Sequence, residues 1–120
     1  MNWKALALAA LVLFLIDLIW LNFIGSTYSA AVEAIQGGRG MRPRLWAGAI
    51  VYLAMAFLLL KERTLWDAFS TGVATYAVYD FTVMALFKDY PLMLGVADSL
   101  WGGVLFTVAR VVLDYSKSIQ

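Results

Sequence analysis

The sequence contains no cysteine and no histidine among its 120 residues. Without cysteine, the chain can form neither disulfides nor thiolate metal ligands. Without histidine, it lacks the commonest metal ligand and the side chain that usually transfers protons near neutral pH. We therefore expect no cofactor and no metal site of the cysteine or histidine type.

Charged residues are also scarce. They make up 14% of the sequence, whereas hydrophobic residues make up 63% and the mean hydropathy is +0.81. A soluble domain carries about 25% charged residues. The net charge of +1 is too balanced to indicate a nucleic-acid partner. This composition favours an integral membrane protein whose main partner is the lipid bilayer.

Four long apolar runs follow one another along the chain. A helix that crosses a bilayer needs about 20 apolar residues. The second run reaches this length only if it begins near Arg42 and its charged ends extend to the interface. The sequence predicts an all-α integral membrane protein, a four-transmembrane-helix bundle forming one domain over residues 1–120. The expected helices are approximately 3–24, 43–60, 65–87 and 92–113.

The segment Gly25–Arg44 is the only long connection between the runs. Apolar residues in its first half recur at the spacing of one helical face. They predict a short interfacial helix between helices one and two. The second half is rich in glycine and contains three candidates for binding anionic lipid headgroups, Arg39, Arg42 and Arg44.

The charged ends of the runs give an expected orientation. With four spans, both termini lie on one face, which carries five basic residues against four on the other face. These are Lys4, Lys61, Arg63, Arg110 and Lys117 against Arg39, Arg42, Arg44 and Lys88. The positive-inside rule then places the termini in the cytoplasm. So small a difference leaves dual topology open.

Three acidic residues lie deep within the apolar runs, namely Asp17, Asp80 and Asp98. Counted from the expected helix ends at 1.5 Å per residue, each lies about 10 Å below the same face. An aspartate at a helix centre costs about 2.5–3.5 kcal/mol in a bilayer, so we expect all three to face the bundle interior. Their mutual repulsion would be relieved by a proton or a hard cation such as Na⁺ or Mg²⁺.

A tryptophan follows two of these acids at the same D-x-x-W spacing. Trp20 follows Asp17, and Trp101 follows Asp98. An indole N–H can donate to a carboxylate, or the ring can separate the site from lipid. Four further residues complete the candidates for binding a proton, cation or ligand: Asn22, Tyr76, Tyr79 and Thr82. The structural alternative is that these groups only hold the helices together.

Taken together, these motifs resemble a small bacterial membrane family, number 2177 among the domains of unknown function. The residues are D-x-x-W-L at 17–21, Tyr28, Tyr52, Y-x-x-Y-D-x-T at 76–82, Lys88 and D-x-x-W-G at 98–102. Val83 stands where the family usually has Asn. The resemblance implies four helices, a shared polar constellation and a location in a bacterial inner membrane, and it supplies no activity.

Three functions are compatible with these features. The first is proton- or cation-coupled transport of a small solute through the carboxylates, by a homodimer because four thin helices leave little room for a pathway. The second is an accessory subunit of a larger membrane complex. The third is an enzyme acting on a lipid or another membrane-soluble substrate. No catalytic residue follows from the sequence.

Overall fold

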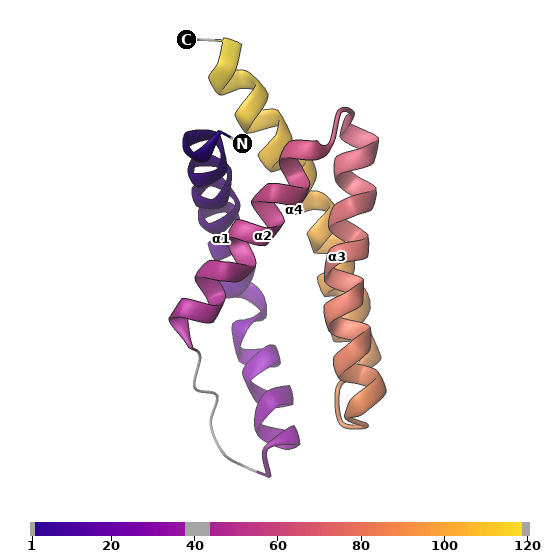
Figure 1. The fold of residues 1–120 in the computed structure, drawn as a ribbon. Coiled ribbons are helices and arrows are strands. Elements are labelled where there is room, and N and C mark those ends of the chain that lie inside the picture. The colour runs from indigo at the N-terminus through magenta and orange to yellow at the C-terminus, as the bar shows by residue number, and fades with distance from the viewer. Residues whose placement is uncertain (1, 38–43, 119–120) are drawn as a thin grey trace.

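The computed structural model of the protein describes residues 2–37 and 44–118. It contains four α-helices, which are α1 (Trp3–Ile35), α2 (Leu45–Lys61), α3 (Leu65–Leu86) and α4 (Leu92–Ser118). The described ranges contain no strand. Helices α1 and α4 run in opposite directions, so the start of α1 and the end of α4 lie at the same end of the bundle (Figure 1). The prediction of an all-helical chain with four helices is confirmed.

Helix α1 is longer than the sequence indicated. It begins at the Asn2 side chain, which accepts hydrogen bonds from the backbone N–H groups of Lys4 and Ala5, and it continues without interruption to Ile35. The expected end at residue 24 and the separate interfacial helix are therefore wrong. A single Gly25 costs a helix only about 1 kcal/mol, and the residues after it keep the helical period. The helix ends only where Gly37 adopts a positive φ of 68°.

Helices α3 and α4 approach each other at small residues. A Cβ atom on Gly72 would overlap the backbone carbonyl of Gly102, and a Cβ on Gly102 would overlap that of Gly72. The next residue of α4, Gly103, lies against the side chains of Phe69 and Val73. This close approach, which the glycine-rich sequence favours, brings the polar residues of α3 next to those of α4.

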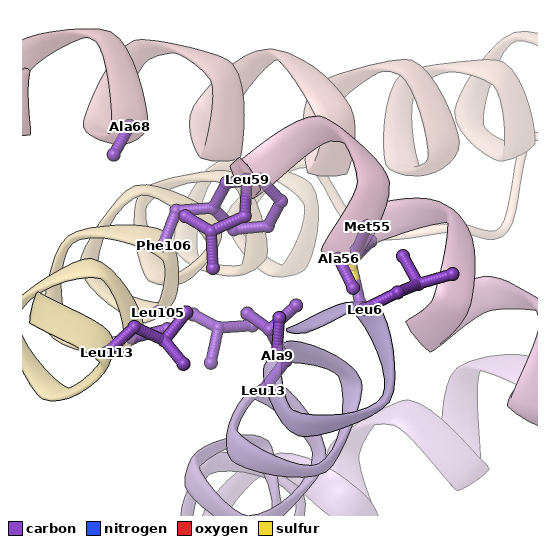
Figure 2. Close-up of a cluster of buried hydrophobic side chains, with 11 residues drawn as sticks. Leu6, Ala9, Leu13, Met55, Ala56, Leu59, Ala68, Leu105, Phe106 and Leu113 are labelled. Carbon is purple, nitrogen blue, oxygen red and sulfur yellow. The ribbon is translucent and has the colours of Figure 1, made fainter. Parts of the chain in front are cut away.

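The main apolar core lies towards the end of the bundle that holds the start of α1 (Figure 2). It combines Leu13 of α1, Leu59 of α2 and Phe106 of α4, all of them fully buried. A smaller cluster near the other end contains Ala31, Tyr90 and Leu94. The candidate polar residues lie between these two apolar clusters.

The outer surface of the bundle is also apolar. Large hydrophobic side chains such as Trp3, Phe23 and Trp66 are more than two-thirds exposed. Two helices, α1 and α4, are long and apolar enough to cross a membrane, and α2 is a shorter apolar helix. Two of the four expected spans thus have the length and hydropathy of a membrane-crossing helix.

The glycine contact between α3 and α4 leads to a stability prediction. Gly72→Ala places a methyl group against the Gly102 carbonyl, so the helices must separate. Overpacking of this kind costs about 1–3 kcal/mol. Thermal unfolding in detergent, followed by circular dichroism, should show a lower midpoint than for the native chain. Gly25→Ala is the matched control, because a Cβ there meets nothing within 4 Å. Equal midpoints for both variants would contradict the packing.

Candidate carboxylate site

The repeated D-x-x-W spacing forms a reciprocal contact between the antiparallel helices α1 and α4. The indole Nε1 of Trp101 donates to Asp17 Oδ1 over 2.7 Å, and Nε1 of Trp20 donates to Asp98 Oδ1 over 2.9 Å. The two indole rings stack between these bonds, with centroids 5.2 Å apart and planes within 7°. Each motif therefore supplies the donor for the acid of the other, and we call this arrangement the indole–carboxylate clasp.

Asp17 connects three helices. It is only 5% exposed, and its second oxygen, Oδ2, accepts a hydrogen bond from the hydroxyl of Tyr52 on α2. The ring of Phe14 packs edge-on against Tyr52, with centroids 5.3 Å apart. Both oxygens of Asp17 thus have donors, one from α2 and one from α4.

Asp80 of α3 is fully buried, and its oxygens differ in their surroundings. Oδ1 accepts a hydrogen bond from the Tyr90 hydroxyl, whereas Oδ2 has no hydrogen-bond donor among the described residues. The Asp98 carboxyl of α4 lies within hydrogen-bonding reach of Asp80. Two carboxyls in this position can share one proton.

Tyr90 belongs to the connection between α3 and α4, yet it is only 3% exposed. Burial, followed by its hydrogen bond to Asp80, raises the pKa of the Tyr90 hydroxyl above its usual value. The hydroxyl therefore keeps its proton and donates to Asp80 at neutral pH. Tyr28 of α1 packs edge-on against the Tyr90 ring, and its own hydroxyl bonds that of Tyr79.

The three acids are brought together by contacts between their helices. Asp17 bonds Trp101, which lies three residues further into α4 than Asp98, and Asp98 reaches Asp80 of α3. The expected depth of about 10 Å below one face was counted from an end of the first helix at Ile24. Because α1 continues to Ile35, that count does not hold for Asp17, and the common level of the three acids stays a prediction.

The other candidates divide into two groups. Tyr76 and Tyr79 line a cavity beside the acids. Asn22 and Thr82 are exposed and do not line it. Among the headgroup candidates, Arg44 directly precedes α2 and is exposed. Arg39 and Arg42 lie outside the described residues.

Tyr52 and Tyr90 were not among the site candidates, although both donate to the acids. Tyr52 was visible in the sequence as a polar residue deep in the second run, and the family resemblance also included it. Tyr90 falls between the expected third and fourth helices, outside the apolar runs. The sequence signal for its position is Pro91, immediately after it. Proline favours the first turn of a helix, so Pro91 indicates that Tyr90 directly precedes the fourth helix. The short turn before Pro91 returns Tyr90 towards the end of α3.

A cavity of about 560 Å³ lies beside the clasp, between α1, α2 and α3. Asp17 and Asp98 border it, and the remaining lining is mainly aromatic and aliphatic, without lysine or arginine among the lining residues. Leu21, Val51 and Tyr79 line it while staying 45%, 52% and 50% exposed. The cavity is therefore open to the outside, and its volume is that of a site for a small organic molecule.

The described residues contain no group of three or more aspartate, glutamate, histidine or cysteine side chains placed to hold a metal ion. The acids of the site occur instead as Asp80 and Asp98, which lie within hydrogen-bonding reach of each other, and Asp17, which bonds Trp101 one turn along α4 from Asp98. The arrangement can accept hydrogen bonds, share a proton, or neutralise one positive charge beside the cavity.

The long apolar helices and the helical fold define a helical membrane protein. The profile of a family described as predicted membrane protein, domain of unknown function 2177 (DUF2177), matches residues 2–113. The chain belongs to this family, and the resemblance found in its motifs is confirmed. No curated protein and no solved structure shows a significant match to the chain.

The clasp gives a second prediction about stability. Trp101→Phe keeps a ring against Trp20 but removes the N–H donor of Asp17. Leaving a buried acceptor with one donor fewer costs about 1–3 kcal/mol, so the unfolding midpoint in detergent should fall. Trp46→Phe is the control, since Trp46 is 66% exposed. The double variant Trp20→Phe/Trp101→Phe should be less destabilised than the sum of the single variants, because the stacked residues are coupled. Additive effects would argue against the clasp.

Proposed function

We propose that this protein carries out proton- or cation-coupled transport of a small, membrane-soluble solute. The solute binds in the cavity, and the contacting carboxyls of Asp98 and Asp80 hold the coupling proton. The observation that carries the proposal is the position of Asp98. It borders the cavity on one side and reaches the buried Asp80 on the other.

Electrostatics supports a proton on this pair. Two ionised carboxylates about 4 Å apart repel by about 4 kcal/mol at an effective dielectric of 20. A shared proton removes this repulsion. A solute that binds beside Asp98 changes the stability of the ionised Asp98–Asp80 pair. Solute binding and proton binding therefore become linked. A hard cation at the same oxygens would act by the same linkage.

The proposal places all four helices across the bilayer, with the termini on the cytoplasmic side. Helix α3 has 22 residues and spans about 33 Å, close to the hydrocarbon thickness. Helix α1 has 33 residues and spans about 50 Å, so its last turns extend beyond the hydrocarbon layer. A second copy of the chain would cover the open side of the cavity and complete a solute pathway.

The open cavity also favours a second candidate function, an enzyme acting on a membrane-soluble substrate. Such a substrate could enter from the bilayer and meet Asp98. Asp98 and Asp80 would then act as a proton-transferring pair. An accessory role in a larger complex ranks below both, because it needs no cavity bordered by acids. Release of a covalently altered product would favour the enzyme.

The transport proposal predicts proton movement that depends on Asp80. Purified protein is reconstituted into liposomes that contain a pH-sensitive dye and carry a pH gradient. A panel of cationic, neutral and anionic amphiphiles is then added. At least one class should accelerate loss of the gradient with the native protein. Asp80→Asn removes the carboxyl that shares the proton, so the acceleration should fall at least tenfold.

The matched control is Asp89→Asn, which removes an exposed carboxyl from the turn between α3 and α4. It should behave as the native chain does. Coupled proton movement that persists in Asp80→Asn, or that no member of the panel induces in the native protein, would contradict the proposed transport.

A further inference from the structure

The lining of the cavity combines two chemical features. The carboxyls of Asp17 and Asp98 border it, and Trp20, Tyr52 and Tyr76 contribute aromatic rings around them. From this lining we infer that the solute is a hydrophobic organic cation, a positively charged nitrogen or phosphorus centre carrying an apolar body. The inference deepens the proposed function, because it names the ligand of the same site.

The acidic side chains of the cavity favour a ligand that carries a positive charge. An anion would approach two acidic side chains with no lysine or arginine in the lining to balance it. A neutral ligand would displace water from Asp98 without compensating its charge, and burying an unpaired charge is costly. A cation offsets the carboxylate charge. The faces of the surrounding aromatic rings attract a cation as well.

The rest of the lining selects an apolar body for the ligand. Away from the acids, the cavity is walled by aliphatic side chains that include Ile24, Val51 and Leu58. A volume of about 560 Å³ is far larger than an inorganic cation needs. A bulky apolar cation fills this space, removes the aliphatic surface from water, and can reach the mouth of the cavity from the bilayer.

Asp98 is the better placed of the two carboxyls to receive the ligand charge. Both oxygens of Asp17 already accept hydrogen bonds, from Trp101 and Tyr52. Asp98 receives one indole N–H, and its other close neighbour is the carboxyl of Asp80. A cation beside Asp98 therefore displaces no donor from α2.

The test compares two ions of nearly equal size and shape and of opposite charge. Tetraphenylphosphonium and tetraphenylborate are titrated separately into the protein in an uncharged detergent. Binding is followed by calorimetry and by tryptophan fluorescence, since Trp20 lines the cavity. We expect the phosphonium to bind at least tenfold more tightly than the borate. Equal affinities, or a preference for the borate, would overturn the inference.

Charge variants locate the binding. Asp98→Asn should weaken phosphonium binding at least tenfold, and Asp17→Asn should weaken it less, because Asp17 is the more fully hydrogen-bonded acid. Asp89→Asn, which lies outside this cavity, should leave the affinity unchanged. Unchanged binding in Asp98→Asn would show that the cation is held elsewhere.

A size variant keeps the inference testable where a charge variant fails to fold. Gly48 lines the cavity, and a Cβ there meets nothing within 4 Å. Gly48→Leu therefore fills the cavity without changing its charge, and it should reduce phosphonium binding at least tenfold. Gly25→Leu is the matched control, with equally open surroundings and a position outside the lining. Equal binding by the two variants would contradict the site.

The ligand class and the transport function can fail separately. Selective phosphonium binding, with loss in Gly48→Leu but without proton movement in liposomes, would support the ligand class and reject transport. Proton movement driven only by neutral or anionic amphiphiles, without phosphonium binding, would support transport and reject the ligand class.

Discussion

The structure depends on how acidic side chains are satisfied inside an apolar bundle. In the proposed four-span placement, a central aspartate costs about 2.5–3.5 kcal/mol, whereas one hydrogen bond between membrane helices contributes about 0.6 kcal/mol on average. The two bonds to Asp17 therefore do not offset the cost of placing it there. Their main effect is orientation, because the clasp holds the carboxyl of each helix against an indole of the other helix, beside the cavity. A purely structural role for these acids explains less than a functional one.

The positions of α3 and α2 follow from different constraints. Gly72 and Gly102 allow α3 to contact the backbone of α4, and this contact brings Asp80 within reach of Asp98. Helix α2 is anchored at its end by the buried Arg110 of α4, which donates to the carbonyls of Leu59 and Glu62. Away from that end, α2 and α3 diverge (Figure 1). The cavity therefore lies where α2 and α3 are no longer in close contact.

Much of this arrangement could be predicted from single residues. The apolar runs predicted four helices, the cost of a buried charge predicted that Asp17, Asp80 and Asp98 face inwards, and D-x-x-W indicated indole donors. Two features could not be predicted. The continuation of α1 past Gly25 depends on whether one glycine ends a helix, which helical period alone does not decide. The partner of each indole depends on the register of α1 against α4, which is a tertiary property.

The clasp also has a consequence for the cavity. Tyr52 lines the cavity and donates to Asp17, so the wall formed by α2 is attached to a carboxyl that Trp101 of α4 holds from the other side. Any group that competes for Asp17 must displace either Tyr52 of α2 or Trp101 of α4. Of these two donors, only Tyr52 belongs to the wall of the cavity. A ligand charge at Asp98 avoids this competition and leaves the wall in place. The two acids of the repeated motif are thus inequivalent: Asp17 positions the helices, and Asp98 is available to a ligand and to Asp80.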